Sequence, residues 1–516
     1  MKRTVSAILR GGALLLVWEL LGRWQLIGSG ALPPPSLILQ QLWADRALYP
    51  PHVLATALPA AEGFLIGNLV AILAALSFQT WPLTERLLVG CSVTLFAIPA
   101  IALAPVLVVT LPGTGPQIAL AAISVYFPTM SATLLGLREA DPRLLEVIRS
   151  YGGARIAELV RVRWPSCLPM MLSGLRVAAP AALLGAILAE FGSGARWGLG
   201  SFLLGSLGQA NPSRLWGIGL VATALSASAY GILSALSYHL LGATLPVTLT
   251  VSVPRPAAAT EPRWQRLLVT LVAAVLPLVV WQGLLELSHL SAIVARTPLD
   301  LFHYLTTSPD AGDARAALLG ALAQSLPLAG LGLATGLASA LAVAMLGFLK
   351  PRLVETLMPV ALLLQSMPLV ALTPLIVLLF GRDFLTTVVV TLSVTFFAAF
   401  ITIAQGLAQT PRPAQEVLAV YGASRLQTLW LAALPGCLPQ ICMAARLVAP
   451  RALLGVMMAE WLATGRGLGN LLNESRGELD YGMIWTVAAV SAAISIAFYL
   501  LVQWLERRVR ARLLSP

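Results

Sequence analysis

The chain has 516 residues, of which 58% are hydrophobic and only 11% charged, and it carries a formal net charge of +11. So few charged side chains cannot cover the surfaces of the roughly three soluble domains that this length would allow, which excludes an ordinary soluble protein. The basic excess is spread over short loops rather than gathered in one block. This distribution argues against nucleic-acid binding and is typical of the loops of a membrane protein.

Apolar windows predict twelve membrane-spanning helices, each close to the ~20 residues that cross ~30 Å of hydrocarbon. We expect the first to be an uncleaved span rather than a signal peptide, because no small-residue cleavage site follows it. The expected fold class is therefore all-α, a polytopic membrane protein with about 12 transmembrane helices in two sets of six. The windows fall at roughly 8–28, 53–78, 87–111, 116–137, 167–191 and 215–242, and then at roughly 266–288, 321–349, 353–380, 384–408, 437–461 and 483–505.

A proline-rich segment separates the two sets. Residues 251–265 contain three prolines, which interrupt any helix and predict a linker. We therefore expect one six-span unit over residues 1–250 and a second over residues 266–516. With both termini in the cytoplasm, the linker is cytoplasmic and most arginines fall in cytoplasmic loops, in agreement with the positive-inside rule.

The two sets carry the same short, partly basic segment. The residues "YGGARIAELVRVRWPSCLP" at 151–169 return as "YGASRLQTLWLAALPGCLP" at 421–439. The similarity continues into the next span, where 170–191 matches 440–461. An even number of spans in each unit makes the repeat parallel, with corresponding loops on the same side of the membrane. Both copies of the segment are therefore expected in the cytoplasm.

Each copy has a glutamate six residues before a glycine and a proline thirteen residues after it. This spacing predicts a short helix, a glycine turn, a second short helix and a proline that opens the next span. Two such elbows suit a cytoplasmic partner with twofold symmetry. The residues are Glu146, Gly152 and Pro165 in the first copy and Glu416, Gly422 and Pro435 in the second.

This pattern resembles the cytoplasmic EAA loop of the permease subunits of bacterial binding-protein-dependent ABC importers, so the chain looks like two such units fused. The residues Gly174 to Arg176, Ala189-Glu190 and Gly198 to Gly200 are similar to the nitrate/sulfonate/taurine branch of that family. The segment "LPPPSLILQQL" at 32–42 is also similar to that branch. The resemblance implies ATPase-coupling loops made by Glu146, Gly152, Ala154, Arg155 and Pro165 and by Glu416, Gly422, Ser424, Arg425 and Pro435.

The resemblance also implies a function and partners. A small solute, for example anionic nitrate, sulfonate, taurine or bicarbonate, would pass from an extracytoplasmic binding protein to the cytoplasm by alternating access. Two ABC ATPase subunits would dock on the cytoplasmic side of a bacterial inner membrane. We expect no enzymatic activity in this chain, because its only lysines, Lys2 and Lys350, belong to no phosphate-binding loop. ATP and Mg²⁺ would bind the partner, and no metal, cofactor or nucleic acid is expected here.

Five charged residues within the predicted spans are candidates for the translocation path, because charge in hydrocarbon is costly and usually functional. Arg176 and Glu190 are fourteen residues apart, about 21 Å along one helix face, and the repeat places Arg446 and Glu460 in the same way. We expect these residues to border the path, with both glutamates near an outer gate. Pairing with other spans is an equal alternative. Arg451, whose counterpart is Ala181, is a charge present in the second unit only and a candidate for attracting an anionic solute.

Two rival functions remain open. An ion-coupled secondary transporter shares the topology and the parallel halves, but it has no need of paired elbows. A fused iron- or thiamine-type ABC permease also carries EAA loops, and only the run from Gly174 to Gly200 favours the other branch.

Overall fold

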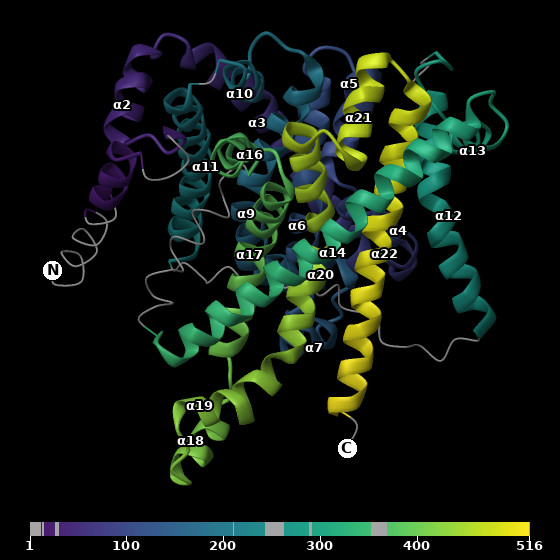
Figure 1. Ribbon diagram of the computed structural model, residues 1–516. Coiled ribbons are helices and arrows are strands. Elements are labelled where there is room, and N and C mark those ends of the chain that lie inside the picture. The colour runs from purple at the N-terminus through teal and green to yellow at the C-terminus, as the bar shows by residue number, and fades with distance from the viewer. Residues whose placement is uncertain are drawn as a thin grey trace.

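The computed structural model describes residues 12, 15–25, 30–209, 211–242, 263–287, 291–351 and 369–514, which form helices and connecting turns without a strand. The expected all-α class is confirmed (Figure 1). The first half contains α2 (Pro35–Ala44), α3 (Tyr49–Thr80), α4 (Pro82–Ala97), α5 (Ala100–Thr110), α6 (Gly115–Arg138), α7 (Pro142–Ser150), α8 (Arg155–Glu158), a π-helical turn (Leu159–Arg163), α9 (Trp164–Ser193), α10 (Leu199–Leu207) and α11 (Pro212–Leu241). The second half contains α12 (Arg263–Leu287), α13 (Pro298–Thr306), α14 (Ala311–Leu349), α16 (Leu369–Phe380), α17 (Phe384–Ala408), α18 (Arg412–Val420), α19 (Arg425–Thr428), a π-helical turn (Leu429–Ala433), α20 (Leu434–Ala459), a second π-helical turn (Glu460–Thr464), α21 (Gly467–Glu478) and α22 (Tyr481–Leu514).

Eight helices of the described chain are long and apolar enough to cross a membrane, and α4 and α5 bring the number to nine if this bent pair is counted as one span. These two helices meet at 97°, so the single helix expected at 87–111 is corrected to a bent pair, the geometry of a broken span or a re-entrant loop. The break falls at Ile98 and Pro99, whose backbones are extended, because a proline disfavours helical geometry in the residue before it. Of the expected span at 8–28 the structure describes residues 12 and 15–25, and of that at 353–380 it describes residues 369–380, which form α16. The rest of these two spans and most of the linker at 251–265 lie outside the described residues.

The second helix of each elbow continues into the following span, whereas the sequence predicted a separate short helix. The continuous helices run over Arg155–Ser193 and Arg425–Thr464. Proline has no N–H to donate to the turn before it, and at Pro165 and Pro435 a π-helical turn joins the elbow helix to the span. Any movement of an elbow is therefore transmitted directly to the span that follows it.

Paired glycines bring helices close together in the core of each half. A Cβ atom at Gly63 or Gly67 of α3 would lie 2.5 Å from a backbone oxygen of α6. At the corresponding positions of α14, Gly332 and Gly336 pack against Thr391 and Thr395 of α17. Small residues four apart allow such close approach of membrane helices, so each half has the same three-helix core, namely α3, α6 and α9 or α14, α17 and α20.

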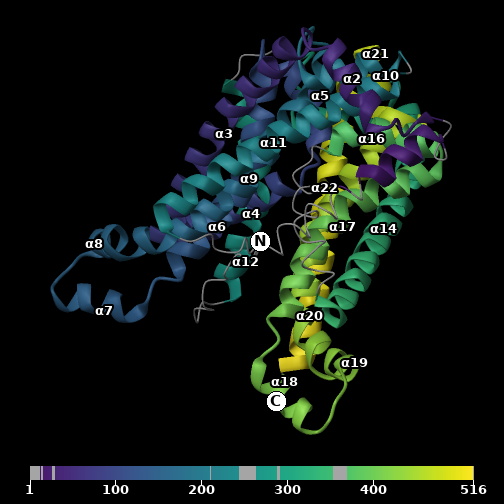
Figure 2. The same ribbon diagram turned by 90° about the vertical axis from the view of Figure 1, so that its left-hand side faces the viewer.

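Helices of each half pack against helices of the other half. The bent pair α4–α5 of the first half packs against α12 and α22 of the second, and α16 of the second half packs against α9 and α11 of the first. Figure 2 shows two bundles that meet where α5, α10, α16 and α21 lie and diverge toward the opposite end. The elbows α7–α8 and α18–α19 project from the diverging end (Figure 2).

Candidate functional site

The first elbow is a helix, a left-handed glycine turn and a second helix. Asp141 caps α7 by accepting a hydrogen bond from the Arg143 N–H (2.9 Å). At the other end, Gly152 has φ +76° and donates to the Arg149 carbonyl (2.9 Å), while Gly153 donates to the Ile148 carbonyl (2.9 Å). This pair of bonds is the Schellman motif, which requires a left-handed residue and so favours glycine.

The second elbow has the same turn. Gly422 has φ +73° and donates to the Ala419 carbonyl (3.0 Å), and Ala423 donates to the Leu418 carbonyl (2.9 Å). No heavy atom lies within 4 Å of a Cβ placed at Gly152 or Gly422. The backbone conformation, rather than a close approach inside the chain, is therefore the local reason for both glycines.

The two elbows are stabilised in different ways. In the first, the Arg149 guanidinium donates to both carboxylate oxygens of Glu158 (2.7 and 3.2 Å), and this contact raises the pKa of Arg149. The second elbow has Ala419 and Thr428 at the corresponding positions. There a capping box stabilises the start of α19. The Ser424 N–H donates to the Gln427 side-chain oxygen (2.7 Å), and the Gln427 N–H donates to the Ser424 hydroxyl (3.2 Å).

Large apolar side chains lie exposed on both elbows. Tyr151 is 87% exposed and Tyr421 85%, far more than a folded chain normally leaves on an aromatic ring. Further exposed apolar side chains flank each tyrosine, namely Val147 and Ile156 in the first elbow and Val417, Val420 and Leu426 in the second. The residues predicted for the coupling loops are all exposed at the same two places, namely Glu146, Gly152, Ala154, Arg155, Pro165, Glu416, Gly422, Ser424, Arg425 and Pro435.

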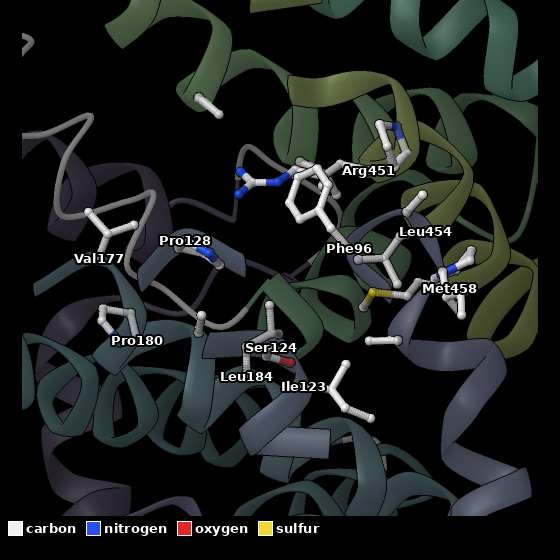
Figure 3. A pocket seen from close by; sticks show the side chains of 18 of the residues that line it. Phe96, Ile123, Ser124, Pro128, Val177, Pro180, Leu184, Arg451, Leu454 and Met458 are labelled. Atoms are coloured by element: carbon white, nitrogen blue, oxygen red, sulfur yellow. The ribbon is translucent and has the colours of Figure 1, made fainter. Parts of the chain in front are cut away.

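A hollow of about 200 Å³ lies between the two halves (Figure 3). Its first-half wall comes from the α4–α5 bend, α6 and α9, and its second-half wall from α17 and α20. Pro180 and Pro450, at matching positions of the repeat, both line it. Arg451 is its only charged lining residue among those that the structure describes, and the counterpart Ala181 lies in the lining too. Of the five charged residues expected along the path, only Arg451 lines this hollow.

Glu190 lies instead near the C-terminal end of α9, away from the elbow, where it is 1% exposed. Its carboxylate accepts hydrogen bonds from the Thr56 hydroxyl of α3 (2.6 Å) and the Gly200 N–H of α10 (2.6 Å). The Leu199 N–H donates to the same Thr56 hydroxyl (2.8 Å). One buried carboxylate thus ties α3 and α9 to the N-terminal end of α10, whose dipole favours a negative charge there.

Glu460 repeats this arrangement in the second half and is also 1% exposed. It accepts from the Ser325 hydroxyl of α14 (2.6 Å) and the Gly469 N–H of α21 (2.9 Å), and the Leu468 N–H donates to Ser325 (2.9 Å). We call the two arrangements the outer clamps, meaning Glu190 with Thr56 and the start of α10, and Glu460 with Ser325 and the start of α21.

The two arginines expected beside the path are buried in the helix bundle. Arg176 is 2% exposed and Arg446 8%. Arg446 pairs with Glu506 of α22 (Nη1 to Oε2, 3.2 Å) and lies over the Tyr499 ring. Neither arginine lines the hollow between the halves.

Sequence reasoning did not find three residues of these sites. Thr56 and Ser325 occupy matching positions of α3 and α14, so a comparison of those two spans would have revealed them as a repeated hydroxyl. Arg476 of α21 donates to the Gly192 carbonyl of α9 (2.9 Å) and lies over the Trp461 ring, which links the two halves at their closed end. Its first-half counterpart is Leu207, so the repeat gives no signal for it.

The described residues contain no cluster of His, Cys, Asp or Glu that could hold a metal ion. The four cysteines, Cys91, Cys167, Cys437 and Cys442, form no disulfide.

Comparison with known proteins gives two matches to one family model, described as a binding-protein-dependent transport system inner membrane component, at residues 67–245 and 332–511. Together they cover more than half of the chain. The chain is 28% identical over 229 residues to a probable ABC transporter permease protein of Haemophilus influenzae, covering 44% of this chain and 93% of that protein.

Two further relatives carry names that state a solute. A formylaminopyrimidine transport permease protein of Halalkalibacterium halodurans is 26% identical over 185 residues, covering 36% of this chain and 74% of its own. A taurine transport system permease protein of Escherichia coli is 27% identical over 233 residues, covering 45% of this chain and 85% of its own. Each relative matches less than half of this chain but most of itself, as expected if one relative corresponds to one of two units.

Proposed function

Because the chain belongs to the family of binding-protein-dependent transport system inner membrane components, we propose that its two fused permease units form the membrane passage of an ATP-driven importer for a small solute. The observation that carries this proposal is the pair of elbows. They share the same glycine turn, project from the same end of the molecule and expose apolar side chains (Figure 2). An exposed apolar patch of this kind marks a protein contact.

Two ABC ATPase subunits are the partners of the elbows. Tyr151, Tyr421 and the apolar side chains around them supply the contact, and the glycine turns hold the short helices at a fixed angle. Because each elbow helix continues into α9 or α20, movement of the ATPases is passed to the helices that line the central hollow. ATP and Mg²⁺ bind the ATPases and not this chain.

Alternating access is the mechanism that we propose for this passage, and the shape of the molecule supports it. The bundles meet at the end of α10 and α21 and diverge toward the elbows (Figure 2), and this divergence supports assigning the structure to the cytoplasm-open state of the proposed cycle. Most arginines of the described loops lie at the elbow end, for example Arg143, Arg155 and Arg161, which supports a cytoplasmic location of the elbows in a bacterial inner membrane. ATP-driven approach of the elbows closes this side and opens the other. An extracytoplasmic binding protein then delivers the solute at the end formed by α10 and α21.

An anionic solute fits the one charge in the central hollow, that of Arg451. The names of the relatives include both taurine and formylaminopyrimidine transport, so the family alone does not fix the solute. The arginine is therefore the observation that favours the anionic class.

The test is to purify the chain gently from native membranes and measure the mass of the intact complex. Two copies of a nucleotide-binding subunit and ATP-dependent uptake in reconstituted vesicles are expected. A chain that purifies alone and transports under an ion gradient without ATP would overturn the proposal in favour of a secondary transporter.

A tryptophan in either glycine turn should uncouple transport. In Gly152→Trp and Gly422→Trp, the side chain strains a left-handed backbone and fills the space that the partner needs. We expect ATP-dependent uptake to fall about tenfold or more in each variant, at normal membrane abundance. The matched control is Gly113→Trp, since Gly113 also has a positive φ (+60°) and open surroundings but lies between α5 and α6, at the opposite end of the molecule. Full uptake in both elbow variants would contradict the docking role.

A further inference from the structure

The hollow between the halves has one charged wall residue, and that charge has no counter-ion in the described part of the chain. Arg451 takes part in none of the ion pairs that the described residues form. An ionised side chain within a membrane span is costly unless it pairs or serves a ligand. The hollow of about 200 Å³ between Arg451 and the first half therefore holds an unmatched positive charge (Figure 3).

The opposite half contributes a second positive feature to the same hollow. Helix α5 begins at Ala100, just after the bend, and both Pro99 and Ala100 line the cavity. The first N–H of α5 that bonds back to the turn is that of Ala102, which donates to the Pro99 carbonyl (2.9 Å). The N–H of Ala100 has no hydrogen-bond partner among the described residues. The N-terminus of a helix carries about half a positive charge, so both halves present positive potential to one cavity.

The remaining walls are apolar. Phe96, Ile123 and Val177 of the first half face Leu454 and Met458 of the second (Figure 3). The two lining hydroxyls are already used as donors, because Ser124 donates to the Leu120 carbonyl (2.7 Å) and Ser393 to the Val389 carbonyl (2.8 Å). Among the lining residues that the structure describes, an anion therefore finds free donors at Arg451 and at the start of α5, and the rest of a ligand meets hydrocarbon.

A cavity with donors at one end and apolar walls elsewhere favours organic anions over inorganic ones. An inorganic oxyanion is hydrated on every side and would lose most of that hydration against the apolar walls. A carboxylate or sulfonate on an apolar body instead directs one charged group to the guanidinium fork, which binds it with two hydrogen bonds, and buries its body against the walls. A single water needs roughly 10–15 Å³ of such space, so the hollow is large enough for a small organic molecule.

We propose that Arg451, together with the N-terminus of α5, forms an intramembrane subsite that selects organic monoanions with an apolar body over inorganic anions, neutral molecules and cations. The inference rests on the proposed function, since it names the solute class that this passage takes. Arg451 is a specificity-determining residue supplied by one half only.

The test measures ligand binding to the purified full-length chain in nanodiscs, by calorimetry and by thermal stabilisation at constant ionic strength. The probes are benzoate, its neutral analogue benzamide, its cationic analogue benzylammonium, and the inorganic anions nitrate and sulfate. We expect benzoate to bind at least tenfold more tightly than each of the other four. Equal binding of nitrate, sulfate or benzamide, or no binding of benzoate, would overturn the proposal.

Three variants locate the site. Arg451→Ala should weaken benzoate binding about ten- to a hundredfold, the range for loss of a charged hydrogen-bonded partner, and it should fold normally because it removes an unpaired charge from the membrane. Arg382→Ala, which alters an exposed arginine outside the cavity, is the matched control and should bind as the original chain does.

The double variant Ala181→Arg with Arg451→Ala moves the charge to the other wall of the same cavity. It should recover benzoate binding to within a few fold, an outcome that a purely structural role of Arg451 would not give. Benzoate binding that is unchanged in Arg451→Ala would refute the subsite. Co-purification with the ATPases and ATP-dependent uptake remain separate readouts, so failure of the subsite is distinguishable from failure of the transport function.

Discussion

At the scale of single residues, the outer clamps explain one glycine at the start of each of α10 and α21, namely the N-cap Gly198 and the first residue Gly467. Gly198 has φ +142°, and a Cβ there would lie 2.5 Å from the Glu190 carboxyl carbon. Gly467 has φ +80°, and its Cβ would lie 2.0 Å from a Glu460 carboxylate oxygen. Two features therefore exclude a side chain at each glycine, namely the positive φ and the carboxylate next to it. The glutamate can occupy its position only because the residue beside it is glycine.

Adding one methyl group at either position should therefore destabilise the protein. For Gly198→Ala and Gly467→Ala we expect a loss of about 1–3 kcal/mol in the free energy of unfolding, the range for a strained backbone with a local clash. The measurement is the apparent unfolding midpoint of the purified chain in detergent. Gly205→Ala and Gly477→Ala are controls on the same two helices, where a Cβ meets nothing within 4 Å. They should be neutral or slightly stabilising, and an equal effect in all four variants would contradict the clamp.

The sequence identified the two clamp glutamates as important but not what they contact. Thr56 and Glu190 are 134 residues apart, and Ser325 and Glu460 are 135 apart. Helical periodicity relates only residues a few turns apart, so no pattern within one span predicts these contacts. The elbow glycines were predictable, because the left-handed turn that they form depends on the few residues around them.

At the scale of helices, hydropathy predicted several spans to within a few residues, as at 116–137 for α6 and 384–408 for α17. Hydropathy did not predict the 97° bend within 87–111, because an apolar window measures composition and carries no information on helix direction. It also divided the continuous helix Arg155–Ser193, whose polar elbow part lies outside any apolar window. Local composition thus predicts where the membrane is crossed but not how the helices bend.

Close packing of α14 against α17 gives a prediction at this scale. In Gly332→Leu the new side chain would meet Thr391 of α17, since even a Cβ at Gly332 overlaps the methyl group of that threonine. We expect the two helices to separate, with a cost of about 1–3 kcal/mol and a clear fall in monodisperse protein after extraction. Gly330→Leu, two residues away on the same helix with open surroundings, should purify normally. Equal yields of the two variants would show that this contact is not tight.

At the scale of the whole molecule, contacts between the halves at the closed end hold the state that the structure shows. Arg476 of the second half donates to the carbonyl of Gly192 near the C-terminal end of α9, where the helix dipole attracts a cation. In the proposed transport cycle this bond joins the halves only while the end formed by α10 and α21 is closed, so it would stabilise that state relative to the other.

Removing this contact should ease the conformational change. In Arg476→Ala we expect the ATPase activity of the reconstituted complex, measured without binding protein, to rise about fivefold, as the loss of ~1 kcal/mol from one state predicts. The control is Arg466→Ala, which alters an exposed arginine just before α21. An unchanged basal rate in Arg476→Ala would mean that the contact does not hold the outer end closed.

The fusion of the two units has a consequence for the cavity that a symmetric assembly could not share. In a dimer of identical subunits, any gene encoding an arginine at the position of Arg451 would also place one at the position of Ala181, and two like charges would face one small, largely apolar space. In a fused chain the two positions vary independently, and here one copy carries arginine where the other carries alanine. The two elbows differ in the same way, one with an ion pair and the other with a capping box. A fused chain can therefore present an asymmetric cavity, which a homodimer cannot form.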